Sequence, residues 1–281
     1  VKEVEELVET ALSVGINAFD LADIYGRGRC EELLGLVLKN RPDLREKMWI
    51  QSKCGIRIEE FTYFDFSKDY IIKSVDGILQ RLKIDHLDSL LLHRPDALME
   101  SDQVAEAFDL LYKQGKVRDF GVSNQNPMMM ELLKKDVKQP LAVNQLQLSA
   151  AFTPGFESGF HVNMEDSQAA IRDGSIFEYC KLHDVVIQAW SVLQFGYFKG
   201  NFVGNEKFQA LNQVLDRLAI KYGVTSSTIA ISWILRYPAK MQAVVGTTNP
   251  KHLREVSQAA NFSLTRKEWY EIYLAAGNNL P

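Results

Sequence analysis

Apolar residues in the first segment of the chain recur at every third or fourth position. Over residues 2–14, Leu7 and Ala11 lie on the face that carries the other apolar side chains, a spacing typical of an amphipathic helix. Gly15 ends this pattern, and a short apolar run at 17–21 predicts a strand. We therefore expect the chain to begin with a helix that leads into a strand.

The same alternation of helix and strand continues along the chain. Further helices are predicted at 31–38, 70–82, 101–114, 128–134, 175–182, 207–222, 226–236 and 250–259, and further strands at 48–52, 87–92, 117–122, 141–148, 185–190 and 243–246. Short apolar strands separated by helices indicate parallel pairing, because each parallel strand needs a crossover of a dozen or more residues. One (β/α)8 TIM barrel over residues 1–281 is the simplest α/β fold with this pattern. A doubly wound open sheet is the alternative, but the sequence lacks the G-x-G-x-x-G turn that usually marks its dinucleotide site.

Polar and aromatic residues follow the predicted strands, at the ends that a barrel gathers around one mouth. Asp20 and Tyr25 accompany the end of the first strand, Lys53 the end of the second and His93 the end of the third. A phenol is a poor proton donor near neutral pH unless a neighbouring cation favours its ionised form. Lys53 is the candidate for that cation, although a lone tyrosine or lysine after a strand is usually a packing or solvated residue.

Composition narrows the classes of function. The net charge of −4 provides no basic surface for nucleic acid or anionic lipid, and no apolar run approaches the length of a membrane span. Three cysteines without C-x-x-C spacing indicate neither a disulfide framework nor a zinc site. A metal-dependent barrel hydrolase is disfavoured, because the histidines lack clustered ligand spacing. We expect a soluble, cytoplasmic protein that binds a small molecule rather than nucleic acid, membrane or metal.

Several motifs, taken together and in order, resemble those of the aldo-keto reductase family, and within it the bacterial reductases known as predicted oxidoreductases. The matching stretches are Asp20-x4-Tyr25 continuing through Gly26-Arg27-Gly28 to Gly35, Ser52-Lys53, the run from Leu79 through Asp88 to His93-Arg94-Pro95-Asp96, Gly121-Val122-Ser123-Asn124, Asn144-Gln145 and Ala189-Trp190-Ser191. This resemblance covers the entire chain. It implies the barrel fold and nicotinamide-dependent reduction of carbonyl compounds.

The resemblance assigns a catalytic tetrad of Asp20, Tyr25, Lys53 and His93. Reduction of a carbonyl by hydride leaves a developing alkoxide, which needs a proton donor and a positive environment. Tyr25 would donate the proton, with Lys53 favouring its ionised form. Asp20 would keep Lys53 charged and aimed, and His93 would orient the carbonyl oxygen. The expected reaction is hydride transfer from NADPH to an aldehyde or ketone; a purely structural histidine is the alternative for His93.

The resemblance also implies a set of cofactor-binding residues. Ser123, Asn124 and Gln145 match the groups that bind the nicotinamide carboxamide, and Trp190 replaces the commoner tyrosine as the stacking ring. The remaining expected cofactor residues are Asp20, Ser191, Leu193, Gly246, Thr247, Thr248, His252 and Glu255. Gly246 and His252 stand where many relatives carry Lys and Arg for the 2′-phosphate. We therefore expect the chain to bind NADP(H) with limited preference over NAD(H). Binding of NAD(H) as well is left open.

Two aromatic-rich segments after strands, at 59–66 and 152–174, are expected to be long loops. Long loops often carry binding functions, so these segments predict walls of a pocket for an apolar or aromatic substrate. Packing at the barrel rim explains the aromatic residues equally well. The main alternative function is a cofactor-binding sensor or regulatory subunit with little turnover.

Only seven barrel strands are predicted, because nothing precedes the helix at 2–14 where the family has its first strand. An open seven-stranded barrel would expose two parallel edges, which natural folds avoid. We therefore expect that an N-terminal segment of about 20–40 residues, the size of a hairpin or loop plus a strand, is absent from this sequence. Closure of the gap by another element or by a partner chain is the alternative.

Overall fold

The computed structural model forms two compact units, unit 1 with residues 1–144 and unit 2 with residues 145–281. The structure describes residues 1–60, 62–161, 167, 174–196 and 199–278. Each unit alternates helices with strands, as the sequence pattern predicts. The expectation of a single domain over 1–281 stays a prediction.

Unit 1 contains every element predicted for residues 1–144, with ends shifted by a few residues. Its elements are α1 (Lys2–Ser13), β1 (Ala18–Asp20), the short 3-10 segments η1 (Tyr25–Gly28) and η2 (Pro42–Lys47), α2 (Arg29–Asn40), β2 (Trp49–Cys54), β3 (Ile56–Ile58), β4 (Thr62–Phe64), α3 (Lys68–Leu82), β5 (Leu87–Leu92), α4 (Ser101–Lys113), β6 (Val117–Ser123), α5 (Pro127–Lys134) and the start of β7 (Leu141–Gln147). The helix α1 precedes β1, the first strand that the structure describes.

In the larger sheet, the strands of unit 1 follow the order β1-β2-β5-β6, and these pairings are parallel. Asp20 lies opposite Gln51, and Cys54 lies opposite Leu92. Because parallel neighbours run in the same direction, the carboxyl ends of β1, β2 and β5 lie along one edge. Asp20, Lys53 and His93 therefore come from neighbouring strand ends.

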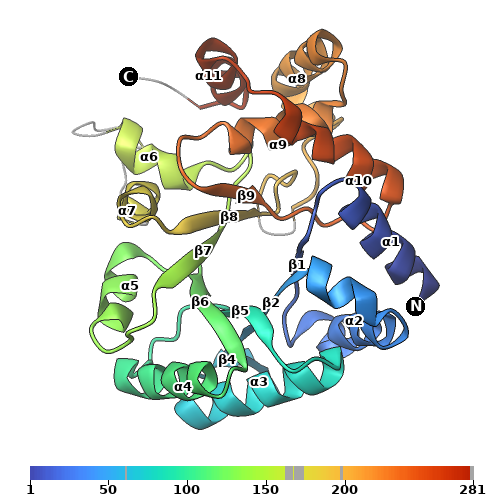
Figure 1. Cartoon of the computed structure of the whole chain (residues 1–281). Helices are drawn as coiled ribbons and strands as arrows, with labels where there is room; N and C mark the ends of the chain where they lie inside the picture. Colours follow the sequence, from blue (N-terminus) through green and yellow to red (C-terminus); the bar gives the residue numbers. More distant parts are fainter. Residues whose placement is uncertain (61, 162–166, 168–173, 197–198, 279–281) are drawn as a thin grey trace. The chain divides into compact units, whose positions relative to one another are not determined.

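Helices α2, α3 and α4 form a row outside these strands (Figure 1). The inward face of α3 carries Ile71, Val75 and Ile78, all fully buried. Burial of each such side chain stabilises the fold by roughly 1.5–3 kcal/mol. On α2, a Cβ added at Gly35 would come within 2.1 Å of the Arg81 carbonyl oxygen of α3. Only glycine allows the two helices to pack this closely.

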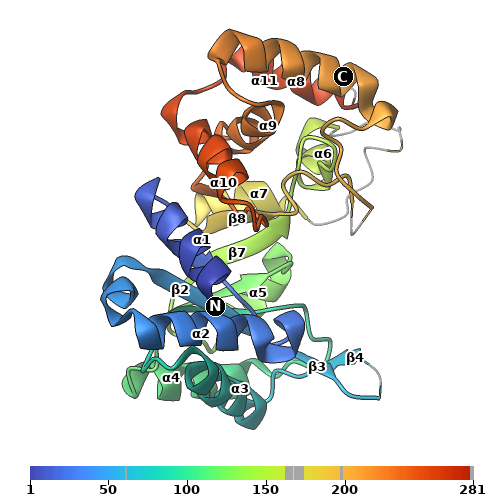
Figure 2. The same cartoon turned by 90° about the vertical axis from the view of Figure 1, so that its right-hand side faces the viewer.

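The segment 59–66, expected as an irregular loop, belongs largely to a two-stranded antiparallel hairpin of β3 and β4. Figure 2 shows this hairpin extending beyond the parallel strands of unit 1. The guanidinium of Arg57 stacks on the rings of Tyr63 and Tyr70, at 5.1 and 4.9 Å from the ring centroids. A loop was expected here because the hairpin stands between β2 and α3, where the alternation of strands and helices predicts only a connection. Phe61 lies outside the described residues.

Unit 2 begins within β7 and contains both predicted and unpredicted elements. They are α6 (Pro154–Phe160), α7 (Ile176–Leu182), β8 (Val186–Trp190), η3 (Glu206–Phe208), α8 (Gln209–Tyr222), α9 (Ser226–Leu235), β9 (Met241–Ala243), α10 (Pro250–Ser257), η4 (Gln258–Asn261) and α11 (Arg266–Ala275). β8 and β9 pair in parallel. The last strand ends at Ala243, so the prediction of a strand at 243–246 was wrong by about three residues, and Gly246 follows the strand. The predicted loop at 152–174 contains α6, and most of its remainder lies outside the described residues.

The helices of unit 2 pack through aromatic side chains. The indole rings of Trp233 and Trp269 stack at 4.9 Å, and each indole N–H donates to the backbone carbonyl of the other residue, at 3.0 and 3.1 Å. The unpredicted helix α11 lies beside α8 (Figure 2) and starts with a capping box formed by Thr265 and Glu268. This motif was the sequence signal for α11.

No single helix in the described part of the chain is long and apolar enough to cross a membrane. The consecutive helical segments at 206–222 and 226–235 have the length and apolar composition of a membrane span only when taken together, and the pair is bent by 92°.

Candidate active site

Three of the four predicted tetrad residues meet at a buried ammonium group. The Nζ of Lys53 donates to Oδ2 of Asp20 at 2.7 Å, to the Leu21 carbonyl oxygen at 2.8 Å and to the Tyr25 hydroxyl at 3.2 Å. Lys53 is fully buried, whereas Tyr25 is 36% exposed. The phenol is thus open to a ligand while its neighbouring cation is shielded from water, which strengthens their electrostatic interaction.

The local backbone explains this convergence. Asp20 is the last residue of β1. The chain beyond it continues beside β2, because the amides of Leu21 and Asp23 donate to carbonyl oxygens of that strand, those of Gln51 and Lys53. A turn follows, in which the Tyr25 amide donates to the Ala22 carbonyl at 3.0 Å. Extended pairing followed by a turn therefore brings the phenol back over the lysine of the adjacent strand.

Gln51 is a supporting residue that the sequence analysis missed. Its Nε2 donates to Oδ1 of Asp20 at 2.6 Å, while Oδ2 of the same carboxylate accepts from Lys53. Both oxygens of Asp20 are therefore held, which fixes the direction of the carboxylate. Gln51 precedes Lys53 by two positions on a strand, so both side chains point to the same face. This periodicity could have revealed it.

His93 is the fourth predicted residue of the tetrad and is 7% exposed. Its ring meets the Tyr25 ring edge to face, with centroids 5.7 Å apart. Burial, together with the nearby charges of Lys53 and Arg94, lowers the pKa of His93 to about 3. The imidazole is consequently neutral at pH 7. Nδ1 of His93 is buried with no hydrogen-bond partner among the described residues.

The lowered pKa of His93 predicts a loss of stability in mild acid. The unfolded chain takes up a proton near pH 6.5 and the folded chain only near pH 3, so stability rises with pH across that interval. Between pH 7 and pH 5, His93 should reduce the free energy of unfolding by about 2 kcal/mol. Denaturant unfolding of the wild type and of His93→Gln at both pH values measures this difference.

The comparison with His93→Gln removes the effects of other titrating groups, which are common to both proteins. Asp23, for example, has a pKa raised to about 7 and alters stability in the opposite direction over the same interval. An equal pH dependence in the two proteins would show that folding does not lower the pKa of His93.

A buried ionic network lies behind the tetrad and was also missed. Glu31 of α2 is fully buried. Its carboxylate accepts from the Ser52 hydroxyl at 2.6 Å and from Nε of Arg81 at 2.7 Å. Removal of one partner would leave a buried charge uncompensated, which is strongly destabilising. The network joins α2 and α3 to the strand that carries Lys53.

The predicted carboxamide-binding residues of unit 1 follow β6. Ser123 is buried, and its hydroxyl accepts from Nδ2 of Asn124 at 2.8 Å. Asn124 has φ of 55°, a left-handed conformation that asparagine tolerates better than most residues. Next to it, Gln125 is fully buried, and neither side-chain amide atom has a partner among the described residues. The sequence analysis did not single out Gln125.

The cofactor residues predicted near β7 and β8 belong to unit 2. Nε2 of Gln145 donates to Oε1 of Gln188 at 3.1 Å, and Nε2 of Gln188 donates to Oε1 of Gln242 at 2.9 Å. This series of amides runs across β7, β8 and β9 and fixes Gln145. Trp190 is the last residue of β8. The two residues that complete this group are Ser191, with φ of 53°, and Leu193.

The predicted phosphate-binding segment leads into α10. Oδ1 of Asn249 accepts from the Lys251 amide at 2.9 Å, and Pro250 occupies the first turn, as in a capped helix start. The predicted residues Gly246, Thr248 and His252 are exposed, whereas Thr247 and Glu255 are half-buried. The Thr247 hydroxyl accepts from the Asn249 amide at 3.2 Å. Hydroxyls and amides surround this helix start, and the exposed residues Lys251 and Arg254 follow within the first turns of α10.

A sequence model of the aldo/keto reductase family matches residues 2–275. The oxidoreductase YdhF of Escherichia coli K12 is 35% identical, over 100% of this chain and 90% of that protein. The 6-dehydroglucose reductase of Agrobacterium fabrum is 33% identical, over 97% of this chain and 87% of that protein. Among solved structures, an aldo-keto reductase from Klebsiella pneumoniae in complex with NADPH has a TM-score of 0.75 at 21% identity, over 96% of this chain and 84% of that chain. The predicted α/β barrel fold and the bacterial branch are both confirmed.

Proposed function

Because this chain belongs to the aldo/keto reductase family, a family of oxidoreductases that act on carbonyl compounds, we propose that it reduces an aldehyde or ketone with hydride from NADPH and that Tyr25 donates the proton. The observation that carries the proposal is the position of the Lys53 ammonium between Tyr25 and Asp20, at 3.2 and 2.7 Å. An acid beside a shielded cation is the arrangement that a developing alkoxide requires.

The residues of the tetrad account for the proton transfer in this reaction. As hydride adds to the carbonyl carbon, the C=O bond becomes a single bond and the oxygen takes the proton of the Tyr25 hydroxyl. The phenolate that remains is stabilised by the Lys53 ammonium, which Asp20 keeps charged. His93 is neutral, because its pKa lies near 3, and so orients the carbonyl oxygen by hydrogen bonding without adding charge.

The residues of the chain fit a nicotinamide cofactor. The hydroxyl of Ser123 and the amide of Asn124 together offer the donor and acceptor groups that a carboxamide needs, and Gln125 beside them keeps an unpartnered buried amide. Asn249 and Pro250 form a helix start whose amides suit an anion. NADP(H), the cofactor in the Klebsiella structure, would supply the hydride when bound.

The substrate that we propose is a small carbonyl compound. The Agrobacterium relative is named for reduction of 6-dehydroglucose, so sugar aldehydes belong in a test panel beside apolar and aromatic ones. The test follows the loss of reduced-cofactor absorbance with each aldehyde or ketone, with Tyr25→Phe as the control. Turnover of at least one compound by the wild type, lost in the variant, is the expected result.

We expect binding of the phosphorylated cofactor with limited preference over the unphosphorylated one. Gly246 and His252 carry no permanent charge for a 2′-phosphate, which leaves hydroxyls, amides and the nearby Lys251 or Arg254 to neutralise it. Quenching of tryptophan fluorescence by NADPH and NADH measures both affinities. A clear preference for NADH would contradict this prediction.

The alternative is a cofactor-binding sensor or regulatory subunit with little turnover. It predicts tight NADPH binding without consumption of NADPH by any carbonyl compound. We favour a reductase over a regulatory subunit, because Tyr25 and Lys53 are in contact and the phenol is exposed.

We further propose that residues 1–281 act as one domain in the cytoplasm. The family match runs across the boundary between units 1 and 2. Cys30, Cys54 and Cys180 are free thiols, as is usual in a reducing compartment.

A further inference from the structure

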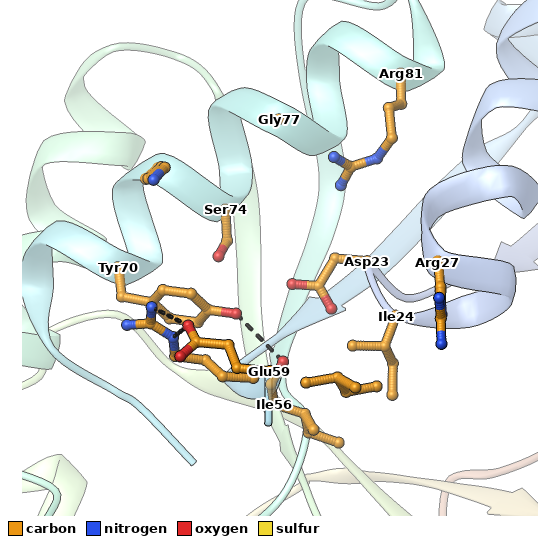
Figure 3. A pocket seen from close by; sticks show the side chains of 12 residues that line it. Asp23, Ile24, Arg27, Ile56, Glu59, Tyr70, Ser74, Gly77 and Arg81 are labelled. Carbon is orange, nitrogen blue, oxygen red and sulfur yellow. Dashed lines mark hydrogen bonds and ion pairs between the residues drawn. The ribbon is translucent and has the colours of Figure 1, made fainter. Parts of the chain in front are cut away.

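A pocket of about 590 Å³ lies within unit 1, between the segment after β1, the β3–β4 hairpin and α3 (Figure 3). None of the tetrad residues lines it. Two of its four cationic side chains, Arg57 and Arg81, are already paired with Glu59 and Glu31. The other two come from different elements, η1 and α3. The four cations therefore do not form one binding group.

Three glutamine side chains of unit 2, in contrast, form a directed series of amide hydrogen bonds. Nε2 of Gln145 donates to Oε1 of Gln188 at 3.1 Å, and Nε2 of Gln188 donates to Oε1 of Gln242 at 2.9 Å. Gln188 and Gln242 lie directly opposite each other on the parallel strands β8 and β9. Gln188 is the middle member and takes part in both bonds.

Two members of this series are buried. Gln145 is 3% exposed and Gln188 is 6% exposed, whereas Gln242 is exposed. Buried amide groups are rarely left without hydrogen bonds, so the bond between Gln145 and Gln188 fixes both side chains. A glutamine side chain loses several free torsions when it is ordered. Because Gln188 orders Gln145 beforehand, a ligand of Gln145 does not have to bear that cost.

The direction of the series determines what Gln145 offers to a ligand. Its Nε2 faces Gln188, so its Oε1, an acceptor with two lone pairs, lies on the other side of the amide group. An acceptor is the group that the NH₂ of a nicotinamide carboxamide needs. Trp190, the ring expected to stack on the nicotinamide, follows Gln188 by two positions on β8. Side chains two positions apart on a strand point to the same face.

We propose that Gln188 is a positioning residue for the cofactor, which accepts from Gln145 and thereby aims Oε1 of Gln145 at the carboxamide NH₂ of the nicotinamide. This inference rests on the proposed function, because it requires NADP(H) binding and contact between Gln145 and the carboxamide. Gln188 acts through Gln145 and does not touch the cofactor. Its loss should therefore weaken recognition of the carboxamide and leave affinity for the rest of the cofactor nearly unchanged.

Calorimetric titration of the full chain with NADP⁺ and with its 3-acetylpyridine analogue tests this role. The analogue carries a methyl group in place of the carboxamide NH₂ and has the same charge. The wild type should bind the analogue about 5-fold or more weakly than NADP⁺, as expected for one hydrogen bond between uncharged groups. In Gln188→Met, the ratio of the two Kd values should fall to about 2 or less, mainly because NADP⁺ binds more weakly.

Gln188→Glu is the conservative variant, because a carboxyl oxygen can still accept from Nε2 of Gln145. Its Kd ratio should return close to that of the wild type. Any added charge acts equally on both ligands and cancels in the ratio. Ile187→Val is the matched control, since Ile187 is a fully buried neighbour on β8 whose side chain points to the opposite face. The Kd ratio of this control should equal that of the wild type.

An equal loss of affinity for both ligands in Gln188→Met would show that Gln188 only stabilises the fold, and would overturn the inference. Equal affinity of the wild type for the two ligands would also overturn it, because Gln145 would then not bind the carboxamide NH₂. If Gln188→Met does not fold, Gln188→Thr, whose side chain is too short to reach Gln145, decides the test. Failure of the wild type to bind NADP⁺ at all would instead refute the proposed function, and this inference with it.

Discussion

Tyr25→Phe is expected to reduce the rate of carbonyl reduction by roughly 10²–10⁴-fold, the usual contribution of a positioned acid. The substitution keeps the ring, and with it the edge-to-face contact with His93, but removes the hydroxyl that accepts from Lys53. Cofactor affinity should stay within a few-fold, because the proton donor is lost without loss of the packing surface. Rates under saturating cofactor, together with fluorescence titration of NADPH, measure both effects.

Equal turnover by wild type and Tyr25→Phe would refute the assignment of the acid. A parallel loss of cofactor affinity would instead show that Tyr25 helps to form the cofactor site. Tyr112→Phe is a matched control, because Tyr112 is an exposed tyrosine of α4 that lies outside the tetrad. That variant should turn over as the wild type does.

Lys53→Met is expected to be similarly inactive, with a loss of roughly 10²-fold or more. Methionine approximates the length of the side chain but removes the ammonium that binds Asp20, the Leu21 carbonyl and Tyr25. Asp20 and Tyr25 then lose the ammonium group that hydrogen-bonds to both, and a phenolate formed on Tyr25 would lose the stabilisation that this charge provides. The turnover rate and KM of the variant, measured separately, give the result.

A lysine that only packs would behave differently, because its loss would weaken substrate binding and leave the turnover rate near that of the wild type. Lys68→Met serves as the control. Lys68 forms an ion pair with Glu106 at 2.6 Å in the same unit, outside the tetrad. Its removal should leave both kinetic parameters nearly unchanged.

The parallel strands β2, β5 and β6 were predictable from the sequence because each has six or seven residues, most of them buried. β5, for instance, is buried at every position and was predicted with its observed ends. The antiparallel hairpin of β3 and β4 was not recognised, because it stands between β2 and α3, where the alternation of strands and helices predicts only a connection. α11 was missed although its capping box is visible in the sequence.

The candidate site was predictable where a side chain follows directly from a strand end, as for Asp20, Lys53 and His93. Gln51 was missed because strand periodicity was not applied to the residue two positions before Lys53. The bond from Arg81 to Glu31 joins residues 50 positions apart in the chain. No local pattern specifies such a contact, and the raised pKa of Asp23 depends on the same burial and the same charges.

Direct hydride transfer to a carbonyl at the tetrad can be tested by following an isotope from the cofactor into the product. NADPH that carries deuterium on the transferable position of the nicotinamide is consumed with the best compound of the carbonyl panel in ordinary water. We expect one deuterium on the former carbonyl carbon of each alcohol formed, for each NADPH oxidised by the wild type. Tyr25→Phe should form the same product at a greatly reduced rate. An alcohol without deuterium, or bound NADPH that no carbonyl compound consumes, would contradict direct hydride transfer.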